Sequence, residues 1–296
     1  DYPNFRPTLD LNFAAEKKLD PKIRYSRNGS RSRINENGFV EFVGPDVPRF
    51  DHDPTTRESL GILIEEESTS VLPRSTGFSS YAVYHQTKIG FNTKGPDGVE
   101  NSAYEYIHDG TSGTTNGGST SIWADGNMGF HNGMACSYYV KITRGTSMSF
   151  VLLDNNSGRN SKKVSISGGV INDDSFATVS LVANSDEGTT VAEPLRNGWV
   201  RVKWFGASLS SSASSYLQLY VHDTVPTSNG SNIGYAIWGF QAEAKLFCTS
   251  TIYKPTTATV SAGDDNLKID GEDFTNFVNS SEGTILADYK VIGGYP

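Results

Sequence analysis

The segment Asp51-His52-Asp53 is the first place where residue types suggest chemistry, because carboxylate and imidazole groups are common metal ligands. Neighbouring residues of an extended chain point to alternate sides, so only Asp51 and Asp53 share a face. Pro48 and Pro54 flank the segment and favour a turn. We therefore interpret the segment as a structural turn and not as a metal centre.

The remaining histidines do not form a catalytic pattern with other residues. They are scattered without the spacing of metal ligands, at His85, His108, His131 and His222. No serine or cysteine lies in a nucleophile-elbow motif. The sequence therefore gives no support to catalysis by a triad.

Carboxylates could in principle hydrolyse a glycoside, which needs two of them about 5 to 9.5 Å apart. With 33 Asp and Glu residues some pair can always be nominated, so the number is not evidence. Glu65, Glu66 and Glu67 follow an apolar run, and we expect them to be solvated at the end of a strand. Glu243 is expected to lie within a strand of a sandwich. We predict that the chain is not an enzyme.

Sugar binding requires aromatic rings that stack on the apolar face of a sugar, beside polar groups that satisfy its hydroxyls. Trp123 lies among polar loop residues at 121–127 and is the strongest candidate for an exposed platform. Tyr104, Tyr106 and Tyr216 are second-rank candidates. A core position explains Trp123 equally well, so both interpretations stay open.

Other aromatic and sulfur-containing residues are expected in the core. Trp199, Trp204 and Trp238 stand inside segments that alternate apolar and polar residues, which is typical of half-buried strands. Cys136 and Cys248 are too few for a disulfide scaffold or a zinc knuckle. We predict that both are unpaired, small, buried residues.

Charge and hydropathy exclude two classes of partner. The net charge of −8 and the pI near 5.2 oppose nucleic-acid binding, which needs clustered lysine and arginine. No apolar run approaches the roughly 18 residues of a membrane span, and the first ten residues lack a signal-peptide pattern. We expect no nucleic-acid partner and no membrane span.

The composition and spacing predict an all-β protein. The 30 glycines and 12 prolines punctuate the chain densely, and aromatic residues compensate for a low aliphatic content. From about residue 76 to 262, strand patterns separated by polar loops have the spacing of a sandwich or jelly roll. The clearest predicted strands are 137–142, 147–153, 199–204, 216–221 and 235–240.

The first 75 residues are predicted to form a separate β module. Leu9 to Phe13 alternates apolar and polar residues and predicts a strand, as does the run 61–67. Asn37-Gly38, between Ile34 and the apolar run 39–43, predicts a hairpin whose turn residues take positive φ angles. Near the C-terminus, Gly283 to Tyr289 predicts another strand.

Several strings resemble the opening and the following domain of tailed-bacteriophage virion proteins. They cover nearly the whole chain, in the order of that family. In the first module the similar strings lie at 9–13, 19–21, 48–54 and 58–66. In the jelly roll they lie at 96–98, 138–141, 197–201 and 237–243. The segments 249–257 and 280–284, with Phe274, are similar to the junction into a laminin-G-like or concanavalin-like domain. The sequence departs from the family pattern at Glu67-Ser68-Thr69-Ser70, where the family tends to show Arg-Thr-Asn.

The resemblance implies a division into three parts. These are an N-terminal β anchoring module at 1–75, a carbohydrate-binding-module-like antiparallel jelly-roll sandwich at 76–262, and a connector with the first strand of a further β domain at 263–296. The last strand fits either a chain that continues beyond Pro296 or a strand that completes another subunit.

The resemblance also implies a function at the virion surface. We expect a non-enzymatic tail-fibre or appendage protein that forms a homotrimer, contacts other virion proteins and binds host surface polysaccharide. Jelly rolls of this type often carry a structural calcium ion, and Asp97, Asp109 and Asp125 are loop carboxylates that could hold one. The alternatives are a capsid decoration or cement protein that binds no sugar, and a polysaccharide-degrading tailspike.

Overall fold

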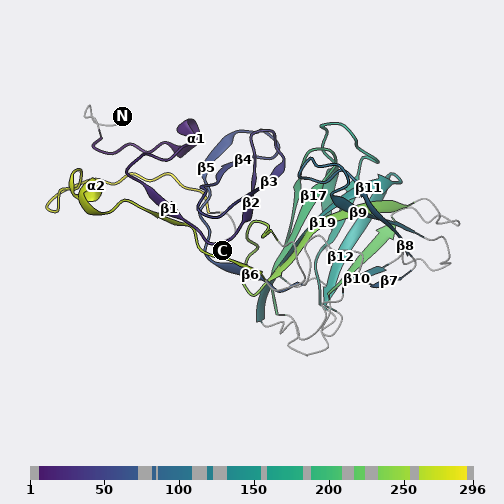
Figure 1. Cartoon of the computed structure of the whole chain (residues 1–296). Coiled ribbons are helices and arrows are strands. Elements are labelled where there is room, and N and C mark those ends of the chain that lie inside the picture. The colour runs from purple at the N-terminus through teal and green to yellow at the C-terminus, as the bar shows by residue number, and fades with distance from the viewer. Residues whose placement is uncertain are drawn as a thin grey trace.

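The computed structural model describes residues 7–72, 82–84, 86–108, 119–122, 132–154, 159–182, 188–208, 217–223, 233–253 and 260–291. Two large antiparallel sheets pack face to face, and a smaller N-terminal β module lies against one of them (Figure 1). The predicted all-β antiparallel sandwich of jelly-roll type is confirmed.

The larger sheet has eight strands among the described residues, and β19 lies near its centre. β19 pairs with β11 along one edge and with β9 and β6 along the other. The strands are β6 Ser68–Ser70, β8 Gln86–Thr93, β9 Ala103–His108, β11 Asn132–Arg144, β16 Thr189–Pro194, β17 Val200–Ser208, β19 Gly234–Glu243 and β20 Val260–Ala262.

The second sheet has seven strands among the described residues, in the order β15-β14-β12-β18-β10-β7, with β13 paired to β12. They are β7 Ala82–Tyr84, β10 Ser119–Ile122, β12 Ser147–Asp154, β13 Arg159–Asn160, β14 Lys163–Ser167, β15 Thr178–Val182 and β18 Leu217–Asp223. The five strands predicted most clearly from the sequence correspond to β11, β12, β17, β18 and β19.

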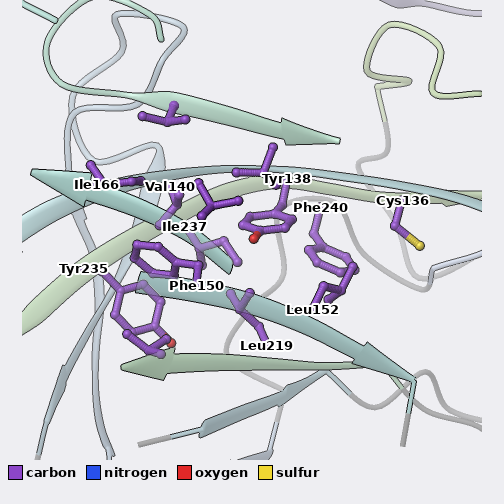
Figure 2. Close-up of a cluster of buried hydrophobic side chains, with 14 of the residues drawn as sticks. Cys136, Tyr138, Val140, Phe150, Leu152, Ile166, Leu219, Tyr235, Ile237 and Phe240 are labelled. Carbon is purple, nitrogen blue, oxygen red and sulfur yellow. The ribbon is translucent and has the colours of Figure 1, made fainter. Parts of the chain in front are cut away.

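The main core lies between the two sheets, where alternate residues of their strands meet (Figure 2). Tyr138 and Val140 of β11 face Phe150 and Leu152 of β12 in this layer, and all four are fully buried. The pattern follows from the two-residue period of a strand, which puts every second side chain on the same face. Trp204 belongs to this core, as predicted.

The opposite face of the larger sheet is also covered. Trp199, Trp238 and Tyr139 form a second cluster there, together with Val40 of the N-terminal module. All ten residues of β19 are consequently buried, which explains why its sequence is nearly continuous in apolar residues. The prediction that Trp199 and Trp238 are core residues is confirmed, but their core is this second one.

A bulge at Gly239 lets β19 serve both cores. Tyr235 and Ile237 face the core between the sheets before the bulge, and Phe240 does so after it. The register with β11 shifts at this point, and Gly239 has a φ of 58°. Only glycine adopts this conformation without strain, and a Cβ here would lie 3.1 Å from Cδ2 of Tyr139.

The N-terminal module contains two short hairpins and one helical turn. Its elements are α1 Phe13–Glu16, β1 Arg24–Ser26, β2 Arg31–Ile34, β3 Val40–Val43, β4 Phe50–His52 and β5 Ser59–Ile62. The predicted hairpin is confirmed as β2–β3. Gly38, with a φ of 80°, is the one residue of its turn that takes a positive φ, since Asn37 does not. The loop closes through the backbone N–H of Asn35, which donates to the Phe39 carbonyl over 2.9 Å.

Two predicted strands are wrong. Leu9 to Phe13 forms no ladder, because the Asn12 side chain accepts the backbone N–H of Ala15 and caps a helix that begins at Phe13. Residues 283–289 have no strand partner among the described residues, and Ile285 is 94% exposed. In both segments the apolar alternation is present, but no neighbouring strand in the described part of the chain supplies hydrogen bonds.

Strand pairing crosses the boundaries predicted between the three parts. β6, from the predicted module at 1–75, pairs with β19 and β20 in the larger sheet. β21 (Asn266–Lys268), from the predicted connector, pairs with β1, and α2 (Gly271–Thr275) follows it. The chain therefore returns from the sandwich to its N-terminal module.

The two helices of the described residues, α1 and α2, have four and five residues. Neither has the length and apolar character of a membrane-crossing helix.

Gly239→Ala should lower the free energy of unfolding by about 1–3 kcal/mol, because alanine is strained at a φ of 58° and its Cβ meets the Tyr139 ring. Chemical denaturation monitored by tryptophan fluorescence measures this loss. Gly283→Ala is the matched control, because an added Cβ there would meet no heavy atom within 4 Å and the φ of Gly283 lies outside the left-handed region. Equal stability of the two variants would contradict the role of the bulge.

Candidate functional site

Tyr104 and Tyr106 lie in the core between the sheets and not at the surface. Tyr104 is 6% exposed and Tyr106 is fully buried, and their ring centroids are 5.0 Å apart. Tyr106 also stacks on Tyr235 of β19 at 5.5 Å. A sugar platform must present a ring face to solvent, so the prediction for these two residues is wrong. Their spacing of two within β9 indicates that they share one face of the strand, but not that this face is covered.

The other two predicted platforms, Trp123 and Tyr216, lie outside the described residues, as do Asp109 and Asp125. Their roles stay predictions. Asp97 is described, and its Oδ1 accepts the backbone N–H of Val99 and the hydroxyl of Ser102, which closes a turn. Within the described residues, no three His, Cys, Asp or Glu side chains gather into a group that could hold a metal ion.

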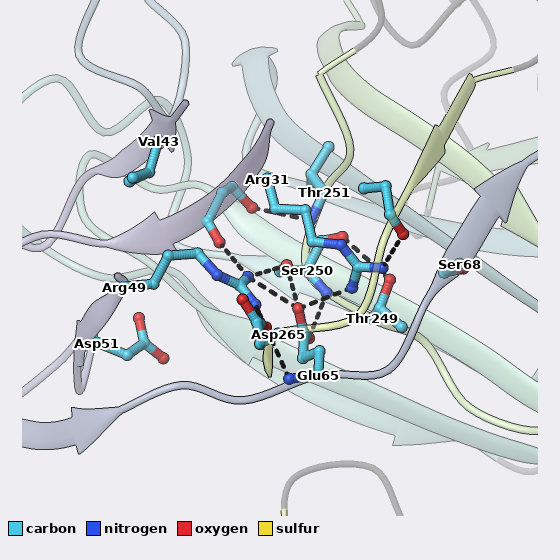
Figure 3. A network of polar contacts seen from close by, with 12 residues as sticks. Arg31, Val43, Arg49, Asp51, Glu65, Ser68, Thr249, Ser250, Thr251 and Asp265 are labelled. Carbon is cyan, nitrogen blue, oxygen red and sulfur yellow. Dashed lines mark hydrogen bonds and ion pairs between the residues drawn. The ribbon is translucent and has the colours of Figure 1, made fainter. Parts of the chain in front are cut away.

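Five charged residues far apart in the sequence meet where the N-terminal module, the segment before β6 and the returning C-terminal segment come together. Figure 3 shows four of them: Arg31, Arg49, Glu65 and Asp265. We call this group the ion cluster: Arg27, Arg31, Arg49, Glu65 and Asp265. The side chains of the three arginines and of Asp265 are fully buried, and that of Glu65 is 14% exposed. The prediction that Glu65 is a solvated strand end is therefore wrong.

Glu65 uses both of its carboxylate oxygens to join separate segments. Oε2 accepts Nη1 of Arg49 at 2.8 Å, Nη1 of Arg31 at 3.1 Å and the Ser250 hydroxyl at 2.5 Å. Oε1 accepts the backbone N–H of Ser250 at 2.8 Å. Three of these four donors share Oε2 and one contacts Oε1, so Glu65 is engaged mainly in holding chain segments together.

Asp265 also accepts four hydrogen bonds, two on each carboxylate oxygen. Oδ1 accepts the Tyr25 hydroxyl and Nη1 of Arg27, and Oδ2 accepts Nη2 of Arg49 and the backbone N–H of Glu65. Burial and then the hydrogen bond to Asp265 raise the pKa of Tyr25 to about 12, so its phenol keeps the proton that it donates. The two carboxylates and three guanidinium groups hold the module to the C-terminal segment.

Electrostatics keep Glu65 ionised. Burial by itself raises the pKa of the Glu65 carboxyl, but the guanidinium groups of Arg49 and Arg31 more than offset it and lower the pKa to about 2. A carboxylate with such a low pKa does not act as a general acid or base near neutral pH.

A second buried carboxylate fastens the segment 249–252 to the outer face of the larger sheet. Glu243 lies at the end of β19, as predicted, and accepts the hydroxyl of Ser68 and the backbone N–H of Thr249. Gln241 accepts the backbone N–H of Ile252 and donates to the Ser250 carbonyl. These side chains hold the segment to β19, while its backbone pairs with β2 at Arg31 and Ile252. Glu243 therefore also has a structural role.

The interpretation of Asp51-His52-Asp53 as a turn is wrong, because Asp51 and His52 belong to β4 and the turn follows at 54–56. The contacts of the two carboxylates are nevertheless structural, as expected. Asp51 Oδ1 accepts the backbone N–H of Ile34, and burial raises the pKa of its carboxyl. Asp53 Oδ1 accepts the backbone N–H groups of Thr55 and Thr56 at 2.8 Å. Asp51 fixes β4 against the end of β2, while Asp53 holds the following turn.

Both cysteines are buried and neither forms a disulfide bond, as predicted. The Cys248 thiol donates to the backbone carbonyl of Cys136 over 3.2 Å. Burial raises the pKa of Cys248 to about 12, so its thiol is not a nucleophile at neutral pH.

A polar cleft of about 380 Å³ opens on the N-terminal module. Its walls come from the β2–β3 hairpin through Arg33 and Glu41, and from β4 through Phe50 and His52. Arg33 and Glu41 are directly opposite each other on the hairpin, and Nη2 of Arg33 lies 2.9 Å from the Glu41 carboxylate. The charges of Arg33 and Glu41 therefore cancel on this side of the cleft.

The rim of the cleft is formed by the hairpin loop at 35–37 and by Lys17, the C-cap of α1. Glu36, Asn37 and Lys17 are exposed. The lining therefore combines amides, both signs of charge and an imidazole around one aromatic residue. The sequence analysis missed this cleft because its lining residues come from three elements that only the fold brings together.

Comparisons with known proteins found weakly similar solved structures, among them a polysaccharide lyase and a carbohydrate-binding module. No family model and no curated protein matches the sequence. Alginate lyase A1-II′, a member of polysaccharide lyase family 7, aligns with 64% of this chain and 96% of its own length, at 11% identity and a TM-score of 0.30. A mutant of CBM29-2, a family 29 carbohydrate-binding module, aligns with 60% of this chain and 91% of its own, at 9% identity and a TM-score of 0.24. Likenesses this weak carry no information on activity.

Glu65→Gln should lower the free energy of unfolding at pH 7 by about 3–5 kcal/mol, because it leaves the buried Arg31 without a carboxylate and Arg49 with Asp265 alone. The Glu65 pKa is lowered in the folded chain, from 4.5 to about 2, so its stabilising contribution is present above pH 4.5 and is lost as the pH falls towards 2. Urea unfolding from pH 7 to pH 2 should show the difference between the native chain and the variant shrinking over that window.

Glu66→Gln is the matched control, because its side chain is 60% exposed and pairs only with Lys245 among the described residues. This control should change stability by less than about 1 kcal/mol. A Glu65→Gln effect that does not vary between pH 4.5 and pH 2 would contradict the electrostatic explanation.

Proposed function

We propose that this chain is a non-enzymatic structural protein of a bacteriophage virion, a tail-fibre or appendage component that binds host surface glycans. The virion assignment is based on the resemblance of the strings at 9–66 and of the jelly-roll strings at 96–243. The sandwich architecture agrees with the fold that this resemblance implies.

One observation carries the non-enzymatic part of the proposal: protein donors occupy the buried carboxylates Glu65, Asp265 and Glu243. Glu65 and Asp265 each accept four hydrogen bonds, and Glu243 holds the segment 249–252. General acid–base work needs a carboxylate that can exchange a proton with a substrate. These groups instead connect chain segments, which suits a structural protein.

The layered construction supports a role as a fixed part of a larger assembly. The larger sheet is covered on both faces, and the module is joined to it by apolar contacts and by the ion cluster. In a homotrimer, three identical glycan sites would act together, so weak binding at each site would yield firm attachment of the particle.

Cryo-electron microscopy of the intact particle tests the placement. We expect density for this sandwich at the tail or in a protruding fibre. Density on the capsid lattice, with a face of the sandwich against shell subunits, would overturn the receptor-binding proposal in favour of decoration.

A glycan array probed with the full chain tests the binding role. We expect retention of host-type surface glycans without release of reducing sugar, and weaker retention by Trp123→Ala at an unchanged melting temperature. Full retention by this variant would remove Trp123 as the platform. Release of reducing sugar would instead indicate a degrading tailspike.

A further inference from the structure

The second sheet ends in a strand whose outer edge is open among the described residues. β15 is the first strand in the order of that sheet, and its ladder partner is β14. Leu181 and Val182 are each 43% exposed, although neighbouring residues of a strand point to opposite faces of the sheet. Thr178 and Ser180 are exposed as well. The edge of β15 is therefore accessible to another strand.

Two other edge strands carry features that discourage such pairing, and β15 does not. β16 contains Glu193 and Pro194, a charge and a residue without a backbone donor. β8 has register shifts on both sides of Gly90 and Phe91. The five residues of β15 include no charge, proline or glycine, and its register with β14 is regular. A regular, uncharged edge is one to which a further strand can add.

The edge of β15 is complementary to itself. An antiparallel pair of β15 strands centred on Ser180 joins all five residues of each copy. It places Thr178 of one copy opposite Val182 of the second copy, and Val179 opposite Leu181. Cross-strand pairs of aliphatic and β-branched residues stabilise sheets. No like charges meet in this pair, which matters for a chain with a net charge of −8.

Charges beside the two ends of β15 favour the same arrangement. Lys163 of β14 is directly opposite Val182, at one end of the strand. Asp173 is exposed and precedes the other end. Neither residue forms an ion pair with a residue that the structure describes. In an antiparallel pair the Lys163 end of one copy lies beside the Asp173 end of the other, so opposite charges are brought together at both ends.

We propose that β15 is a docking edge for a second copy of this chain, and that antiparallel β15–β15 pairing joins the second sheets of two copies into one continuous sheet. Both copies use the same surface, so the contact closes at two copies and leaves no open β15 edge. It is independent of glycan binding and of the three-fold contact of a homotrimer, and between trimers it would join two of them. Strands this short bury little area, so the association is weak and depends on concentration.

Sedimentation equilibrium of the full chain over a wide range of concentration measures the association. We expect the mass to double as the concentration rises. Leu181→Lys places a lysine on the edge, as natural edge strands do, and should raise the dissociation constant at least about tenfold. Leu246→Lys is the matched control, because Leu246 is 50% exposed and lies outside β15, and it should associate as the native chain does.

A disulfide cross-link tests the register independently of the lysine variant. Ser180 faces Ser180 of the second copy in the proposed pair, so Ser180→Cys should form a covalent dimer under mild oxidation, and a reductant should reverse it. Thr178→Cys is the matched control, because Thr178 faces Val182 of the second copy and should cross-link much less. The native Cys136 and Cys248 are buried and do not compete.

Three results would overturn the proposal. These are a mass that does not change with concentration, an equal effect of Leu181→Lys and Leu246→Lys, and equal cross-linking of Ser180→Cys and Thr178→Cys. If Leu181→Lys does not fold, the concentration dependence of the native chain and the two cysteine variants still decide.

Discussion

The rest of the structure depends on the buried ion cluster. Glu65, which precedes β6, and Asp265 bind three arginines of the N-terminal module and so connect it to the chain that returns from the sandwich. Charges placed in a protein interior are tolerated only when each is paired and hydrogen-bonded. The segments that carry the five residues must therefore dock together. If one segment were missing from the docked arrangement, the charges that it pairs with would stay buried without a partner.

This constraint explains the layered arrangement of the molecule. Once the module is fixed by the cluster, Val40 on its hairpin covers Trp238 and Tyr139 on the outer face of the larger sheet. Alternation along β19 turns Trp238 outward into this second core, and the bulge at Gly239 then returns Phe240 to the core between the sheets. The central strand β19 is consequently buried on both faces.

The ion cluster and the cleft both use residues of β2, and both use residues at the start of β4 or directly before it. β2 carries Arg31 of the cluster and Arg33 of the cleft, and Arg49 directly precedes β4, which supplies Phe50 and His52. The contacts that hold the module to the sandwich thus also hold the walls of the cleft. A site built on paired strands in this way is positioned more accurately than one built on a long loop.

The sequence by itself determined the local features of this protein: the two-residue alternation of β11, β12, β17, β18 and β19, the β2–β3 hairpin and the burial of Trp199, Trp204 and Trp238. These depend on residues near one another in the chain. Only the tertiary structure decided that Tyr104 and Tyr106 face the core, that Glu65 is buried beside Arg31 and Arg49, and that residues 283–289 stay unpaired among the described residues. Alternation indicates a face but not what covers it, and the pKa of a carboxylate depends on charges that lie far away in sequence and close in space.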